Sequence, residues 1–301
     1  MQENYSTFVT GKFQSWVLAS RPKTLLAAVV PVVVGSSLAI GKDNFQIVYS
    51  IIALACSLLI QIGTNFVNDL YDYLKGADNE KRKGPTRVLA SGLISVKEMR
   101  IGIFITFSLS FLLGLILVYK AGIVILIIGV LSILAGIAYT AGPFPLAYKG
   151  LGDIFVFIFF GIIGTTFTYY VFAKEFTLIS FLASIPVGAL ITNILVINNY
   201  RDIDEDRLAG KITLAVILGK NLTRVQFLLQ LAASFIVPVL LFFLYDFKIW
   251  ILLPLLSLPL AIKLVNMLFL LDGFQLNKAL EITAKFSAIF GLLFSVGLAF
   301  R

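Results

Sequence analysis

Nine apolar runs, each close to the length of a membrane-spanning helix, set the strongest limit on what this chain can fold into. A helix needs roughly 20 predominantly apolar residues to cross the hydrocarbon core of a bilayer. The runs lie at residues 24–40, 45–67, 101–119, 121–140, 154–173, 177–197, 225–245, 249–271 and 282–300. We therefore predict an all-α, polytopic membrane protein of about nine transmembrane helices, with residues 1–301 forming a single domain.

The composition supports this prediction and excludes other classes of protein. Hydrophobic residues make up 59% of the chain and charged residues 13%, whereas about a quarter of the residues in soluble domains are charged. The chain has no His and a single cysteine, Cys56, which excludes a Cys/His metal site and an internal disulfide. A bound metal would therefore need oxygen ligands.

The basic residues are distributed unequally among the predicted loops. Of the 24 Lys and Arg residues, 17 fall on one side of the predicted membrane and five on the other. This bias predicts that the amino terminus and the long polar segments 68–100 and 198–224 are cytoplasmic, and that the carboxyl terminus lies outside. Because the cations are spread over many loops, the net charge of +8 indicates membrane topology and not nucleic-acid binding. No sequence feature indicates an obligate protein partner.

Eight of the 16 acidic residues are concentrated in two short segments, 69–80 and 202–206, each directly after an apolar run. The sequence around the start of the first segment, residues 63–78, reads GTNFVNDLYDYLKGAD. If the second helix continues through it, Asn68 and Asp72 share one helix face, and Gly76 ends the helix before Asp78. The first segment therefore predicts a row of side-chain oxygens at the inner end of that helix.

The sequence around the second segment, residues 198–220, reads NNYRDIDEDRLAGKITLAVILGK. Asn198, Asp202 and Asp206 lie four residues apart in succession, which places their side chains on one helix face. Two such rows facing each other would form an oxygen-lined cleft. Clustered carboxylates need cations, and Mg²⁺ is normally held by one or two carboxylates together with substrate phosphates. The interleaved basic residues are then candidate diphosphate ligands: Lys75, Arg82, Arg87, Arg201 and Lys211.

Two other interpretations fit parts of this pattern. The acidic segments could be ordinary solvated loops, in which acids and bases are mixed for solubility. A secondary transporter would also be polytopic, but transporters place ionisable groups near the middle of the bilayer, and the middles of these spans contain no Asp or Glu. The recurrence of an acidic segment after four spans instead indicates two four-helix halves with a ninth helix appended.

The motifs resemble those of the UbiA superfamily of intramembrane aromatic prenyltransferases, over nearly the whole chain. The stretches that carry the resemblance are RPKT (21–24), NDLYDYLKGAD (68–78), GPTR (84–87), YTAGPFPLAYKGLGD (139–153) and NNYRDIDEDRLAGKITLAVILG (198–219). The sequence is most similar to the branch that prenylates 1,4-dihydroxy-2-naphthoate in menaquinone synthesis. In the ubiquinone-type pattern N-D-x-x-D-x-x-x-D the last Asp would fall at Gly76, which argues against 4-hydroxybenzoate as acceptor.

The resemblance implies an enzyme of the bacterial cytoplasmic (inner) membrane. Its reaction would be the Mg²⁺-dependent transfer of a polyprenyl group from polyprenyl diphosphate to 1,4-dihydroxy-2-naphthoate, with decarboxylation, to give demethylmenaquinone and diphosphate. The alternatives are another acceptor, either 4-hydroxybenzoate or homogentisate, and a phytyl donor. Two magnesium ions, with Lys and Arg, would stabilise the negative charge that grows on the leaving diphosphate.

Each candidate residue has an expected role in this reaction. The expected metal ligands are Asn68, Asp72, Asp202 and Asp206, with Asp69, Asp78 and Asn198 as second choices. The three carboxylates Asp72, Asp202 and Asp206 are also expected to be essential for catalysis. The candidates for binding diphosphate are Arg21, Lys149 and Arg201, of which Lys149 rests on analogy with a lysine of the family. Tyr139 and Asp153 are candidates for steering or deprotonating the acceptor, although an interfacial anchor and a helix N-terminal charge are equally good explanations for them.

Overall fold

The computed structural model describes residues 11–76 and 87–300, so Asp78 lies outside the described residues. Within them the chain is helical apart from connecting loops and one isolated bridge between Lys149 and Ile212. The helices are α1 (Lys12–Ser20), α2 (Pro22–Ala39), α3 (Ile47–Leu74), α4 (Val96–Ala121), α5 (Ile123–Ala138), η1 (Leu146–Tyr148), α6 (Gly152–Val156), η2 (Phe157–Ile163), α7 (Gly164–Ala173), α8 (Leu178–Arg201), α9 (Ile203–Leu208), α10 (Leu214–Leu244), η3 (Ile249–Ser257), α11 (Leu258–Leu270), η4 (Gly273–Gln275) and α12 (Leu276–Ala299).

Each predicted span coincides with one helix or with consecutive helices. Among the described residues, eight stretches are long and apolar enough to cross a membrane. The fourth predicted span is the shorter helix α5, whose 16 residues correspond to about 24 Å of helix. The prediction of an all-α membrane bundle is confirmed, with eight long spans and the shorter α5 in place of nine equal ones.

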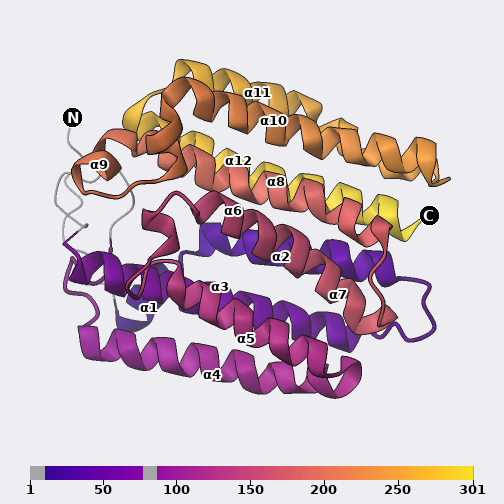
Figure 1. The fold of residues 1–301 in the computed structure, drawn as a ribbon, viewed down its shortest axis with the longest axis horizontal. Helices are drawn as coiled ribbons and strands as arrows, with labels where there is room; N and C mark the ends of the chain where they lie inside the picture. The colour runs from indigo at the N-terminus through magenta and orange to yellow at the C-terminus, as the bar shows by residue number, and fades with distance from the viewer. Residues whose placement is uncertain (1–10, 77–86, 301) are drawn as a thin grey trace.

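The last helix lies in the middle of the bundle. In Figure 1, α3, α4 and α5 form one side and α10 and α11 the other, with α2, α8 and α12 between them. Helix α12 packs against α2, α8 and η3. Its side chains Phe286, Phe290 and Phe294 are almost completely buried in this contact. The ninth predicted span therefore joins the two groups of helices, whereas the sequence indicated a helix appended to them.

The fifth predicted span is one continuous helical stretch made of α6, η2 and α7, with a π-helical segment at its centre. It approaches α8 closely, because a Cβ added at Gly161 would lie 2.5 Å from the Cα of Gly188. Glycine at both positions allows this close backbone packing, as is common between helices in membranes. π-helical turns are frequent at functional sites, and this one forms part of the cavity wall described below.

The helices bring both acidic segments to the same end of the bundle. Helix α3 continues past Asp72 to Leu74, and Gly76 follows with a φ of 68°, as predicted for a helix terminated by glycine. The second segment occupies the end of α8 and the short helix α9. Figure 1 shows α1 and α9 at one end of the bundle and the last turn of α12 at the other.

Candidate active site

A cavity of about 1200 Å³ runs between α2, α3, α5 and the α6–η2–α7 span. Its lining includes residues of both acidic segments at one end and extends to Val118 and Ile125 near the other end of the bundle. The acidic end is polar, whereas most of the remaining wall consists of aliphatic and aromatic side chains. The cavity therefore combines a charged mouth with an apolar chamber.

The first acidic segment contributes a buried carboxylate with two partners. Asp72 accepts a hydrogen bond from Arg87 Nη2 at Oδ2 (2.7 Å) and another from the Tyr148 hydroxyl at Oδ1 (2.7 Å). Arg87 Nη1 also lies 3.6 Å from Asp69 Oδ1. Beside them, Asn68 Oδ1 accepts a hydrogen bond from the Thr140 hydroxyl (2.8 Å). Each carboxylate oxygen can accept more than one interaction, so Asp72 retains the capacity to bind a cation.

The second acidic segment is fixed by a buried arginine. Arg201 donates to both oxygens of Asp202, at 2.6 Å each, and also to Asn198 Oδ1 (2.9 Å). A further guanidinium nitrogen donates to Asn277 on α12. Because the Arg201 side chain is only 1% exposed, these contacts hold Asp202 and Asn198 in one orientation at the cavity wall.

Asp206 is in an electrostatically unfavourable position. It is buried, its Oδ1 lies 3.5 Å from the Lys211 amine, and its Oδ2 has no hydrogen-bond partner among the described residues. Burial raises the pKa of this carboxyl, and the negative charges of Asp202 and Asp72 raise it further, while Lys211 lowers it. The effect of Asp72 means that the two acidic segments face each other closely enough for their charges to interact.

The loops that carry these groups are joined directly. The Ile212 backbone N–H donates to the Tyr148 carbonyl (3.3 Å), which links the loop after α5 to the loop after α9. The Lys75 amine donates to the Thr140 carbonyl (2.7 Å) and lies 4.3 Å from the centre of the Tyr148 ring. Burial lowers the pKa of this lysine, although Asp72 opposes the shift. Tyr148 is thus held between the two acidic segments.

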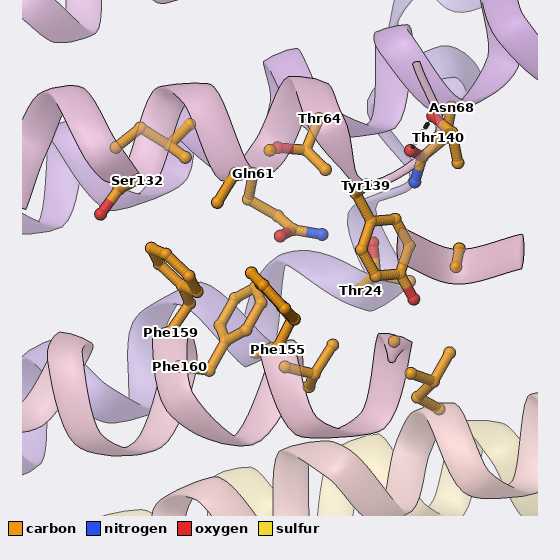
Figure 2. A pocket seen from close by; sticks show the side chains of 18 of the residues that line it. Thr24, Gln61, Thr64, Asn68, Ser132, Tyr139, Thr140, Phe155, Phe159 and Phe160 are labelled. Carbon is orange, nitrogen blue, oxygen red and sulfur yellow. Dashed lines mark hydrogen bonds between the residues drawn. The ribbon is translucent and has the colours of Figure 1, made fainter. Parts of the chain in front are cut away.

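Beyond the acidic end, aromatic rings line the chamber. Figure 2 shows Phe155, Phe159 and Phe160 on one wall, with Tyr139 and Gln61 projecting from the other helices. Phe155 and Phe159 stack at a centroid distance of 5.9 Å. The faces of such rings are electron-rich and attract cations. These rings could not be selected from the 27 Phe and 11 Tyr of the chain by sequence alone.

Asp153 lies on the same cavity wall and is held by two amides. Gln226 Nε2 donates to its Oδ2 (2.7 Å), and Asn199 Nδ2 lies 3.4 Å from its Oδ1. Asp153 is 4% exposed. In the described part of the chain its partners are neutral amides and not cations, and a buried carboxylate in such surroundings can accept a proton.

The structure brings together most of the residues predicted from the sequence. Those that line the cavity are Arg21, Asn68, Asp69, Asp72, Tyr139, Asp153, Asn198, Asp202 and Asp206. Of the basic residues predicted to bind diphosphate, Lys75, Lys149 and Arg201 do not line it, and Arg82 lies outside the described residues. Lys149 is exposed, with its amine 5.7 Å from the centre of the Phe144 ring, and Arg201 is buried against Asp202. Arg87 and Lys211, which were also predicted, do line the cavity. The sequence interpretation missed Tyr148, Gln226 and Gln61.

The oxygen ligands at the mouth fit a hard divalent cation such as Mg²⁺. They are carboxylate and amide oxygens from two sides of one cavity, and Asp206 Oδ2 is buried without a partner. In the described part of the chain, no three acidic side chains converge closely enough to form a complete metal site. This arrangement suits Mg²⁺, which is usually held by one or two carboxylates with substrate phosphates supplying the remaining ligands.

Comparison with known proteins places the chain in a family. Residues 28–289 match the family described as the UbiA prenyltransferase family. The chain belongs to this family. It is therefore a prenyltransferase and an integral membrane protein, and the transporter interpretation of its polytopic sequence is excluded.

Individual relatives agree with this assignment. The chain is 37% identical over 293 residues to the 1,4-dihydroxy-2-naphthoate octaprenyltransferase of Escherichia coli, covering 95% of each protein. Among solved structures, it resembles a UbiA homolog from Aeropyrum pernix with a TM-score of 0.71 at 17% identity, covering 91% of this chain and 97% of that one. A UbiA homolog from Archaeoglobus fulgidus bound to DMAPP and Mg²⁺ has a TM-score of 0.64 at 18% identity, covering 94% of this chain and 99% of that one. The two structural matches establish the fold.

Proposed function

We propose that this protein transfers a polyprenyl group from polyprenyl diphosphate to 1,4-dihydroxy-2-naphthoate, in a Mg²⁺-dependent reaction. A bond forms between C1 of the prenyl group and the ring carbon that carries the carboxylate, while the C1–O bond to diphosphate breaks. The carboxylate then leaves as CO₂, and the electron pair of the broken C–C bond restores the aromatic ring. The products are diphosphate, CO₂ and demethylmenaquinone in its reduced form.

The observation that carries this proposal is the position of both acidic segments on one cavity whose deeper part is apolar and aromatic. The relative from Escherichia coli supports the acceptor, and the homolog bound to DMAPP and Mg²⁺ supports the donor class and the metal. The departure at Gly76 from the ubiquinone-type pattern also favours the naphthoate over 4-hydroxybenzoate.

The polar mouth is suited to bind the metal–diphosphate group. Asn68, Asp72, Asp202 and Asp206 would hold two Mg²⁺ ions, which when bound stabilise the charge on the leaving diphosphate. Diphosphate oxygens would be bound by cations of the cavity lining: Arg21, Arg87 and Lys211. We assign Arg201 the role of positioning Asp202, because its guanidinium donates to both oxygens of Asp202 and is not part of the cavity lining.

The chamber is suited to protect a reactive allylic cation until the acceptor captures it. Its apolar wall excludes water, and the faces of Phe155, Phe159 and Phe160 can stabilise positive charge. Tyr139 and Asp153 line the cavity, where they would orient the acceptor. Asp153 would take the proton of a ring hydroxyl while the ring attacks, and would return it to that oxygen when CO₂ leaves, so that the product is the reduced quinol. The apolar lining that continues to Val118 and Ile125 gives the polyprenyl chain a path along the bundle.

An assay with several acceptors tests the proposal. Membranes that contain the protein are incubated with Mg²⁺ and labelled polyprenyl diphosphate, and 1,4-dihydroxy-2-naphthoate, 4-hydroxybenzoate and homogentisate are offered in turn. We expect lipid-soluble product and CO₂ release with the naphthoate, and no product when Mg²⁺ is removed by EDTA. Product with 4-hydroxybenzoate but none with the naphthoate would refute the proposed acceptor. A phytyl diphosphate arm tests the donor in the same way.

We also propose that the acidic end of the bundle faces the cytoplasm. Cys56 is the single cysteine of the chain and is buried, so an introduced cysteine can be labelled selectively. Ser91→Cys, near the acidic end, should react with a membrane-impermeant maleimide only in inside-out vesicles. Lys174→Cys, at the opposite end, should react in intact cells, and the reverse pattern would overturn the proposed orientation.

A further inference from the structure

Gln61 is a polar side chain in the chamber that the mechanism above does not use. It lies in α3, in an otherwise apolar stretch, and it lines the cavity. Its position is seven residues before Asn68, which corresponds to about 10 Å along the helix axis. The side chain is therefore deeper in the chamber than the residues proposed to hold the metal, on the same side of the cavity.

Neighbouring hydrogen bonds fix the orientation of the Gln61 amide. Asn65 Nδ2 donates to the Ser20 carbonyl (2.8 Å) and lies 3.2 Å from the Thr24 hydroxyl oxygen. Because a carbonyl only accepts, Asn65 must direct its amide nitrogen toward Ser20 and its Oδ1 toward Gln61. Gln61 Nε2 donates to that oxygen (3.3 Å). The nitrogen and oxygen of an amide have nearly the same shape, so shape alone does not tell them apart. Here the hydrogen bond to Asn65 assigns the nitrogen of Gln61.

This arrangement leaves hydrogen-bonding capacity directed at the chamber. Within the described part of the chain, the only hydrogen bond of the Gln61 side chain is the one to Asn65, so its Oε1 and one N–H remain for another partner. Figure 2 shows the amide projecting into the space between Tyr139 and the wall that carries Phe155. A polar group on an apolar wall is costly unless a partner satisfies it.

We infer that the Gln61 amide binds an oxygen substituent of the aromatic acceptor and so positions its ring for attack on the prenyl cation. This inference rests on the proposed function and adds a residue to it. An isoprenoid tail has no hydrogen-bonding groups, so the donor chain does not account for an amide at this depth. A phenolic hydroxyl can donate to Oε1, while the free N–H can donate to a ring oxygen.

A neutral amide also suits the chemistry better than a charged group. A carboxylate at this depth would attract the allylic cation and compete with the acceptor ring as its nucleophile. A lysine or arginine would repel the cation. An amide can orient an oxygenated ring without either effect, and its remaining hydrogen bond to Asn65 limits its rotation. Gln61 is accordingly a positioning residue for the acceptor.

The test compares Gln61→Met with a matched control in the same chamber. Methionine has a similar length and no hydrogen-bonding amide, so the chamber keeps its volume. Ser132→Ala is the control, because the Ser132 hydroxyl lines the cavity but already donates to the Ile128 carbonyl of its own helix (2.8 Å). We expect Gln61→Met to raise the KM for the acceptor about tenfold. The KM for the prenyl diphosphate should stay within about twofold of the wild type, and Ser132→Ala should change neither constant.

A binding measurement separates positioning from a structural role. Mg²⁺-dependent binding of labelled prenyl diphosphate to purified protein in detergent should be equal in Gln61→Met and wild type. A parallel loss of donor binding would show that Gln61 supports the α3 framework through Asn65, and it would overturn the inference. An unchanged acceptor KM would also overturn it. If Gln61→Met does not fold, Gln61→Asn keeps the amide but shortens it, and it should give the same selective rise in acceptor KM.

The two proposals can fail separately. If the wild-type enzyme uses another hydroxylated aromatic acid, the proposed acceptor is wrong, and the Gln61 variants are then measured with the acid that is used. A selective rise in the KM for that acid supports the role of Gln61 in spite of the wrong acceptor. If the naphthoate is the substrate and its KM is unaffected, the proposed function stands and the role of Gln61 is refuted.

Discussion

The two ends of this helical bundle both carry charged side chains, but carboxylates are buried at one end and exposed at the other. At the end where α9 lies, Asp72, Asp202 and Asp206 are each 8% exposed and line one cavity. At the other end, Glu175 and Lys42 form an ion pair at 3.0 Å whose side chains are 51% and 38% exposed. Charge at the ends of membrane helices is ordinary, so burial around a cavity is what distinguishes the end that we propose to be catalytic.

The pKa shifts of these groups show the same difference between the two ends. Hydrogen bonds from Lys42 and Tyr169 lower the pKa of Glu175, and the Glu175 hydrogen bond raises that of Lys42, so the protein favours both charges. Burial raises the pKa of Asp206, and the nearby Asp202 and Asp72 add to that effect. In the exposed pair, Lys42 and Glu175 neutralise each other. The ionised Asp206 carboxylate is in an unfavourable position, which an additional cation would make more favourable.

The largest expected effect comes from removing one carboxylate on each side of the cavity. Asp72→Ala and Asp202→Ala should each lower kcat at least about a hundredfold, because each removes a proposed metal ligand at the leaving diphosphate. Activity is measured in membranes with matched amounts of protein. Both variants should still be inserted, since neither residue lies inside an apolar span core. Normal turnover in either one would remove that residue from the proposed metal site.

The sequence predicts those features of the fold and the site that depend on helix length and local spacing. Hydropathy identified the spans because bilayer thickness fixes their length. The clustering of acids at helix ends selected Asn68, Asp72, Asp202 and Asp206, which all line one cavity in the structure. Helix α1 was missed because its nine residues are too few and too polar to register as a span. Helix α10 begins at Leu214, before the apolar run at 225, and bends at Gly219, which has a φ of 70°.

Contacts between segments that are far apart in the chain could not be predicted from the sequence. Tyr148 binds a carboxylate 76 residues away and Gln226 binds one 73 residues away, so local spacing carries no sign of either pair. The error at Lys149 has the same origin, because residue type and family analogy do not show which way a loop side chain points. Gln61 could have been predicted from the sequence, because it lies four residues before Asn65 on the helix face that leads to Asp72.

The second largest effect is expected on stability. Arg201→Ala removes the partner of Asp202 and leaves a buried, uncompensated carboxylate, a change that typically costs about 3–5 kcal/mol. The unfolding midpoint of the purified protein in detergent should fall strongly, and Arg201→Lys should rescue little of it, because lysine lacks the bidentate fork. The matched variant Arg87→Ala also removes a cation from a buried carboxylate, Asp72, so it should lower stability and in addition raise the KM for prenyl diphosphate, because Arg87 lines the cavity. A stable Arg201→Ala protein with a raised donor KM would instead restore Arg201 as a direct diphosphate ligand.

Removing the charge of Asp206 is expected to change stability less than Arg201→Ala does, and to raise it instead of lowering it. Because its pKa is raised in the folded protein, its ionised form destabilises the fold at neutral pH, and that cost disappears below the unfolded pKa of about 3.9. In EDTA, Asp206→Asn should therefore raise the unfolding midpoint by a few degrees near pH 7, which corresponds to about 1 kcal/mol. The difference should shrink as the pH falls toward 4. Lys211, which is 23% exposed, can turn its amine to solvent in the variant.

The function of Asp206 should be lost in the same variant that gains stability. Mg²⁺-dependent activity should fall at least about tenfold, because the amide is a weaker ligand for a divalent cation than a carboxylate. Added Mg²⁺ and diphosphate should stabilise the wild type more than the variant, since a ligand stabilises the state that binds it. A variant that is both less stable in EDTA and fully active would contradict the contrast drawn between the two ends.

The smallest effect is expected at the far end. Lys42→Ala and Glu175→Ala break an exposed ion pair, which solvent and salt already weaken, so activity and donor KM should match the wild type. The lowered pKa of Glu175 means that its stabilising contribution is present at neutral pH and is lost as the pH falls through that pKa, so any stability difference should vanish in acid. High salt should reduce it as well. A large loss of turnover in Glu175→Ala would show that the far end communicates with the cavity, and burial at the α9 end would then no longer suffice to define the functional region.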